Sequence, residues 1–136
     1  MPILQTVPFW IHILIEAPAS INFFFNPSEQ LPSPASQAHA IIRQYAVLLL
    51  VSNLIALIFA LRPLDQTGKN VAAALSVYHL APVVRAGTRI FYSFYGDSYG
   101  QGLGGPWLHL SVHGGCFVAL STLGLWGKIE KKRIKD

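Results

Sequence analysis

Glu16 is the residue with the clearest chemical potential, because it lies near the middle of the first long apolar run of the chain, residues 7–25. A carboxylate at bilayer depth is energetically costly and is uncommon there without a partner or a function. Burial favours the protonated form of a carboxyl group and poises it for proton transfer. We therefore predict that Glu16 is a general base or a nucleophile, with a structural ion pair to Arg43 or Arg85 as the alternative.

Other polar residues lie inside the later apolar runs, at depths that bring them near Glu16. Asn53 and His79 fall close to the midplane, and Tyr78 adjoins His79. We predict that Asn53 positions water or substrate. His79, with Tyr78 or Arg85, is expected to act as an acid that stabilises a developing oxyanion. The structural alternatives are a core histidine bonded to a carbonyl group for His79 and a helix-bridging amide for Asn53.

A second group of polar residues falls in the half of the bilayer that we assign to the lumen. We predict that these residues bind the substrate: Arg43, Arg89, His109 and His113. His109 and His113 stand four residues apart, on one helix face. If Glu16 or His79 supplied a third ligand, this pair would also suit zinc. We favour a site with no metal and no cofactor. The single cysteine, Cys116, offers neither a disulfide nor a metal-binding cysteine spacing.

The composition indicates an integral membrane protein. Of the 136 residues, 52% are hydrophobic and only 12% are charged, and the mean hydropathy is +0.44, which is too apolar for an ordinary soluble domain. A helix needs about 20 mostly apolar residues to cross the hydrocarbon layer. Four segments meet that length, at residues 7–25, 41–61, 70–94 and 106–127. The chain is therefore predicted to be all-α, with residues 1–136 forming a single transmembrane domain, a four-helix bundle.

Proline and glycine give two predictions about the interior of the bundle. Pro82 interrupts the third span and frees a backbone carbonyl group near residue 78, so it is expected to bend that span around a pocket. Gly114 and Gly115 are expected to allow close helix approach in the same region.

The distribution of positive charge predicts the orientation of the bundle. Arg62 and Lys69 flank the second connection, a basic tail follows the last span at residues 128–136, and the first and third connections contain no lysine or arginine. Cytoplasmic segments are enriched in these residues, so both termini are predicted to be cytoplasmic. We expect the endoplasmic reticulum membrane. Membrane topology and attraction to anionic lipid headgroups account for the positive charge of the tail, so no nucleic-acid partner is expected.

Several short segments resemble a family of small fungal membrane proteins with four predicted spans. They are Ile15-Glu16-Ala17-Pro18 followed by Asn26-Pro27, then Leu48-Leu49-Leu50-Val51-Ser52-Asn53-Leu54 leading to Arg62, and the step Tyr78-His79. Some members of that family are epoxide hydrolases of polyketide biosynthesis, as in the aurovertin and citreoviridin pathways. The resemblance covers most of the chain and implies four spans and an epoxide-opening reaction. The fourth span has no clear counterpart in it.

These observations predict a membrane-embedded enzyme of polyketide or terpenoid biosynthesis that opens an epoxide by hydrolysis or cyclisation. Opening an epoxide needs an acid on the ring oxygen, and either a base that activates water or a carboxylate that attacks carbon. The substrate is expected to be a lipophilic small molecule that enters from membrane lipid. Two other classes stay open: an isomerase or terpene-type cyclase that acts by protonation, and a non-enzymatic transport or assembly subunit. The sequence also leaves the oligomeric state open between a monomer and a homodimer.

Overall fold

The structure, a computed structural model, describes residues 2–31, 35–92 and 104–129. Every regular element in these ranges is a helix, so the predicted all-α class is confirmed. The helices are α1 (Pro2–Phe25), α2 (Pro27–Gln30), α3 (Ser36–Ala60), α4 (Gln66–Tyr78), α5 (Leu80–Tyr92) and α6 (Gly105–Trp126). Most of the glycine-rich third connection and of the basic tail lies outside the described residues.

Three helices are long and apolar enough to cross a membrane, at Gln5–Phe25, Ser36–Ala60 and Gly105–Trp126. They correspond to the first, second and fourth predicted spans. Their outward faces carry large exposed apolar side chains, among them Leu14 on α1, Leu48 on α3 and Leu125 on α6. Such faces suit contact with lipid, because lipid tails are themselves apolar.

The third predicted span, residues 70–94, is two helices instead of one continuous helix. α4 ends at Tyr78 and α5 begins at Leu80, with His79 in a turn between them. The cause is Pro82, which has no N–H group to donate to the carbonyl group of Tyr78 and whose ring crowds that carbonyl. The break is short, because the His79 amide still donates to Ser76 O (3.0 Å).

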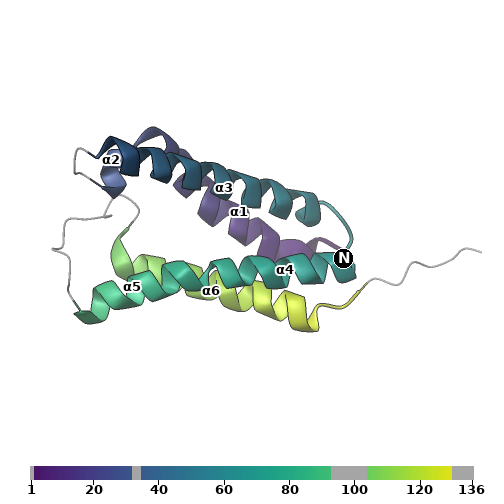
Figure 1. The fold of residues 1–136 in the computed structure, drawn as a ribbon. Coiled ribbons are helices and arrows are strands. Elements are labelled where there is room, and N and C mark those ends of the chain that lie inside the picture. The colour runs from purple at the N-terminus through teal and green to yellow at the C-terminus, as the bar shows by residue number, and fades with distance from the viewer. Residues whose placement is uncertain (1, 32–34, 93–103, 130–136) are drawn as a thin grey trace, which may run out of the picture.

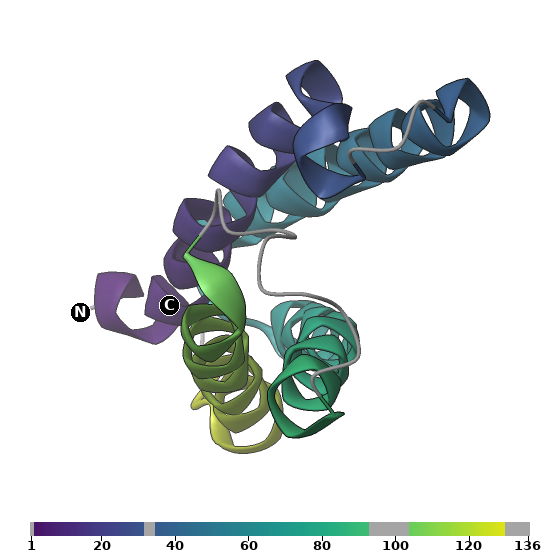
Figure 2. The same ribbon diagram turned by 90° about the vertical axis from the view of Figure 1, so that its left-hand side faces the viewer.

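The helices form two layers, with α1, α2 and α3 in one and α4, α5 and α6 in the other (Figure 1). Within the layers, α1 packs against α3, while α6 packs against α4 and α5 along their lengths. The layers meet where α1 contacts α6, and the end-on view in Figure 2 shows them diverging from that contact. Residues that project from α1, α6 and the α4–α5 junction therefore share the interior.

An apolar core fills the half of the bundle in which α4 lies. Its buried members are Phe9, Ala56, Ala60, Leu64, Ala72, Leu75, Cys116, Leu120 and Leu123. Helices α6 and α4 approach closely at Gly124 of α6, where an added Cβ atom would lie 3.1 Å from the backbone nitrogen of Ala73. The prediction for Gly114 and Gly115 is wrong, since a Cβ atom on either would meet no atom within 4 Å.

Candidate functional site

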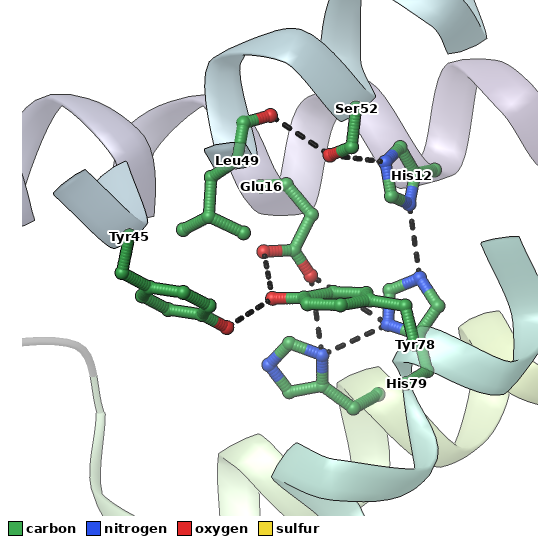
Figure 3. Close-up of polar contacts among 8 residues, drawn as sticks. His12, Glu16, Tyr45, Leu49, Ser52, Tyr78 and His79 are labelled. Carbon is green, nitrogen blue, oxygen red and sulfur yellow. Dashed lines mark hydrogen bonds and ion pairs between the residues drawn. The ribbon is translucent and has the colours of Figure 1, made fainter. Parts of the chain in front are cut away.

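Glu16 lies on the inner face of α1 with only 1% of its surface exposed, and its two carboxylate oxygens have different surroundings. Oε2 accepts a hydrogen bond from the hydroxyl group of Tyr78 at 3.1 Å (Figure 3). Oε1 lies 3.3 Å from Nδ1 of His113 and 3.5 Å from Nδ1 of His79. The carboxylate thus meets one phenol and two imidazoles from the opposite layer.

The imidazole of His79 connects this carboxylate to a third histidine. Its Nδ1 atom lies 3.0 Å from Nδ1 of His113, and its Nε2 atom lies 3.0 Å from Nδ1 of His12. His12 Nε2 in turn lies 3.3 Å from the hydroxyl oxygen of Ser52, which donates to the carbonyl group of Leu49 at 2.8 Å. Figure 3 shows this series running from α3 through α1 to the α4–α5 junction.

The helix break explains how Tyr78 and His79 both reach one carboxylate. Consecutive residues of an unbroken helix point in different directions and do not share a face. Here Tyr78 is the last residue of α4 and His79 lies in the turn that follows, so the two are not consecutive residues of one unbroken helix. On α1, by contrast, His12 and Glu16 share a face simply because they stand four residues apart.

A cavity of about 200 Å³ adjoins the carboxylate. Its lining contains Glu16, Ala19, Phe23, Gln30, Tyr45, Tyr78, Ala81, Pro82, Arg85, Ala86, Arg89, Pro106, His109 and His113. These residues extend from Glu16 towards the α2 end of the bundle, at the left of Figure 1. The cavity is mostly apolar, with the cationic side chains Arg85 and Arg89 along α5. The lining thus combines apolar surface with the carboxylate of Glu16 and two guanidinium groups.

The structure brings together only some of the predicted catalytic residues. Glu16, Tyr78 and His79 meet as described, and Arg85 lines the cavity without joining an ion pair of Glu16 in the described residues. Asn53 is buried, but it is not among the residues that line the cavity. Its side-chain oxygen and nitrogen have no hydrogen-bond partner in the described part of the chain. The predicted role of Asn53 in positioning substrate therefore has no geometric support.

The predicted substrate-binding residues also divide into two sets. Arg89 and His109 line the cavity, whereas His113 contacts Glu16 directly and so belongs to its centre. Arg43 is exposed and donates from Nε to the carbonyl group of Phe24 at 3.2 Å. It neither lines the cavity nor forms the ion pair that was the structural alternative for Glu16, whose Oε1 atom lies instead beside the imidazoles of His79 and His113.

Four side chains near the site were not among the predicted site residues: His12, Tyr45, Ser52 and Cys116. Tyr45 lines the cavity, and its hydroxyl oxygen lies 2.9 Å from that of Tyr78. His12 was detectable, because it stands on the face of Glu16. Ser52 and Cys116 had no signal of their own, since a hydroxyl or a thiol in an apolar helix is common without function.

Two sets of side chains in the described residues place ligand atoms within 4.8 Å of one another. One set is Glu16, His79 and His113; the other is His12, His79 and Cys116. Comparison with known proteins found no matching family model, no matching curated protein and no matching solved structure. The fold and site define a helical protein with membrane-length helices and a buried glutamate–histidine cluster beside a cavity.

Proposed function

We propose that this protein is a membrane-embedded enzyme that opens an epoxide in a lipophilic polyketide or terpenoid, by hydrolysis or by cyclisation. The observation that carries the proposal is the buried carboxylate of Glu16 at the cavity, contacted by the hydroxyl group of Tyr78 and the imidazoles of His79 and His113. A buried carboxylate beside proton donors combines the base and the acid that epoxide opening requires. The resemblance to fungal epoxide hydrolases points to the same reaction.

The proposal includes four membrane crossings, with both termini in the cytoplasm. α4 and α5 together run from Gln66 to Tyr92, which exceeds the roughly 20 residues that one crossing needs. Their break at His79 is acceptable at membrane depth, because it lies against protein in the bundle interior. The basic residues Arg62, Lys69 and Lys128 then lie on one side of the membrane, and the cavity extends towards the other. We place the protein in the endoplasmic reticulum.

The contacts of Glu16 suggest a closed cycle of proton transfers. The carboxylate takes a proton from water as the water oxygen bonds to a ring carbon. The carbon–oxygen bond of the ring breaks, and the ring oxygen takes a proton from the Tyr78 hydroxyl group. Tyr78 recovers a proton from Glu16 across their 3.1 Å contact. The products are a diol and an unchanged site; if a hydroxyl group of the substrate replaces water, the product is a cyclic ether.

The cavity supports a substrate that is apolar along most of its length. Ala19, Phe23 and Ala86 offer apolar surface, while Arg85 and Arg89 offer hydrogen-bond donors to oxygen atoms further from the reacting ring. Such a molecule partitions into lipid, and the exposed apolar helix faces would let it reach the protein from the membrane.

The test is conversion of epoxide-bearing lipophilic substrates by the full chain in detergent, followed by mass spectrometry. We expect diol or cyclic ether from the wild type, and a fall in turnover of about 10²- to 10⁴-fold in Glu16→Gln, which keeps the shape of the side chain but cannot act as a base. Glu29→Gln is the matched control, because Glu29 is exposed and accepts a hydrogen bond from Asn22 at 2.9 Å. Its turnover should equal that of the wild type.

Two results would contradict the proposal. One is a folded Glu16→Gln variant that is as active as Glu29→Gln. The other is a folded wild type that converts no epoxide across a panel of polyketide-like and terpenoid epoxides, which would favour a transport or assembly role.

A further inference from the structure

We propose that Glu16, His79 and His113 bind a zinc ion at the edge of the cavity. This inference deepens the proposed function, since it assigns a cofactor to the same site, and it departs from the sequence-based expectation of a metal-free one. Only the catalytic use of the ion depends on the proposed function. The binding itself is argued from the three ligand atoms and their surroundings.

The distances between the ligand atoms match those around one metal ion. Nδ1 of His79 and Nδ1 of His113 lie 3.0 Å apart, and Oε1 of Glu16 lies 3.5 Å from the first and 3.3 Å from the second. Zinc lies about 2.0–2.1 Å from its nitrogen and oxygen ligands, so neighbouring ligands of a tetrahedral site are separated by about 3.3 Å. Three side chains from α1, α6 and the α4–α5 junction thus form one face of such a tetrahedron.

The carboxylate oxygen of this group is the one without a hydrogen bond. Glu16 Oε1 is fully buried and has no hydrogen-bond partner among the described residues, whereas Oε2 accepts from Tyr78. A buried oxygen without a donor carries a desolvation cost that a bound cation would remove. The unpartnered oxygen is also the one that lies closest to both imidazoles.

The hydrogen bonds behind His79 leave its Nδ1 atom without a proton, which is the state that a metal ligand needs. The Ser52 hydroxyl group donates to the carbonyl group of Leu49, so its oxygen accepts from Nε2–H of His12. Neutral His12 then has no proton on Nδ1 and accepts from Nε2–H of His79. Neutral His79 therefore presents the lone pair of Nδ1 to Glu16 and His113. Outer hydrogen bonds of this kind commonly fix the tautomer of a metal-binding histidine.

The ligand types favour zinc at a site that is open on one side. Two histidines and one glutamate are a known ligand set for catalytic zinc, with water or substrate in the fourth position. The cavity reaches Glu16 and His113, so that position is accessible. The same ligand types also suit iron(II) in oxygenases. We choose zinc because epoxide opening needs no electron transfer.

A bound zinc ion would change how water is activated, while Tyr78 keeps its part. Zinc would lower the pKa of a bound water molecule to about 7, so the water could release its proton to solvent without Glu16 as the base, and Tyr78 would regain from solvent the proton that it gives to the ring oxygen. Glu16 becomes a ligand that the hydrogen bond from Tyr78 holds in place. The overall reaction stays the addition of one water molecule, or of one substrate hydroxyl group, across the ring.

The competing ligand set is His12, His79 and Cys116, which shares His79. A metal bound through the two nitrogens that face each other would replace the hydrogen bond between Nδ1 of His12 and Nε2 of His79, which links His79 to His12 and Ser52. Cys116 also packs within the apolar core, among Ala72 and Leu120. The two sets are separable experimentally, since only one of them contains a thiol.

The experiment measures the metal content per protein molecule of the full chain, purified in detergent, by elemental mass spectrometry. We expect one equivalent of zinc in the wild type. In Glu16→Gln and in His113→Asn the affinity for zinc should fall by at least about 100-fold, since loss of even an outer-sphere partner typically lowers metal affinity 10–100-fold. His39→Asn is the matched control, because His39 bonds to the carbonyl group of Leu31, outside the cluster. This variant and Cys116→Ala should keep their zinc.

A second measurement uses the wild type alone, so it holds even if a cluster variant fails to fold. After treatment with a chelator, added zinc should raise the thermal unfolding temperature, because it binds only the folded chain. Added cobalt(II) should give the visible bands of a tetrahedral site without the near-ultraviolet band of a thiolate ligand.

Several outcomes would overturn the zinc proposal: no zinc bound and no shift in unfolding temperature, iron in place of zinc, loss of zinc in Cys116→Ala, or equal loss in His39→Asn and His113→Asn. Its failure differs from failure of the proposed function. A zinc-free protein that opens epoxides contradicts the zinc site alone. A zinc-loaded protein that opens no epoxide contradicts the reaction alone.

Discussion

The two halves of the bundle differ in what fills the space between the helices. In the half that contains α4, alanine and leucine side chains pack closely, and α6 approaches Ala73 at Gly124. In the other half, a carboxylate, two tyrosines and imidazole rings surround a cavity. The first half contributes contact area between helices. The second half encloses a cavity in place of such contact.

The change from one half to the other occurs along single helix faces. The buried residues of α6 are His113, Cys116, Leu120 and Leu123, which pass from polar to apolar in three turns. On α1, Phe9 is followed on the inner face by His12 and Glu16. The polar site is therefore continuous with the packed core, and rigid helices hold its side chains in place. Catalytic groups need such support, because small displacements cost large factors in rate.

The largest effect that separates the two halves is expected from Tyr78→Phe. Removing the hydroxyl group takes the donor from Glu16 Oε2 and the proton source from the ring oxygen, so we expect turnover to fall by about 10²- to 10⁴-fold. Turnover per folded protein is measured with the epoxide substrates above. Tyr45→Phe is the comparison, since Tyr45 contacts Tyr78 but not Glu16, and its loss of activity should be smaller. If Tyr78→Phe were as active as the wild type, Tyr78 would not be the proton donor of the reaction.

A smaller effect, on stability alone, is expected from Gly124→Ala. The new Cβ atom would lie 3.1 Å from both the Ala73 backbone nitrogen and the Lys69 carbonyl oxygen, and backbone atoms cannot easily move aside. Gly115→Ala on the same helix meets no atom within 4 Å and gains the same helix propensity. We expect Gly124→Ala to be less stable than Gly115→Ala by about 1–3 kcal/mol in thermal unfolding in detergent. Equal stabilities would show that α4 and α6 are less tightly packed than described.

Hydropathy and spacing were enough to predict the helical class and the membrane-length helices α1, α3 and α6. They also predicted that Glu16 and His79 would meet, since both are polar residues at similar depth in apolar segments. The interruption expected from Pro82 is present as the break at His79, because the missing N–H group of proline acts locally whatever the tertiary structure. Hydropathy, depth and a proline break all depend on residues that are close together in the sequence.

The sequence-based predictions that failed concern the direction in which side chains face. Arg43 and Asn53 were both predicted to join the site, but they stand ten residues apart on one helix, and ten residues at 3.6 per turn leave about 80° between two side chains. Arg43 is exposed and Asn53 is buried. The close approach expected at Gly114 and Gly115 is instead at Gly124. Which of several glycines touches a neighbour depends on how helices cross, and one sequence does not specify that crossing.

The smallest effect is expected at the polar contacts on the packed half, where Asp65 precedes α4. Its Oδ1 atom accepts a hydrogen bond from the backbone amide of Gly68 at 2.7 Å, and Oδ2 lies 3.5 Å from the exposed Arg62. Asp65→Ala should therefore lower the free energy of unfolding by about 1 kcal/mol through loss of the helix cap. Asp65→Asn keeps a capping oxygen but loses the ion pair, which is worth little at an exposed position, so it should stay close to the wild type. Turnover per folded protein should be unchanged in both variants, since polar contacts in this half only stabilise the fold; a fall in Asp65→Asn would mean that the start of α4 is coupled to His79 at its far end.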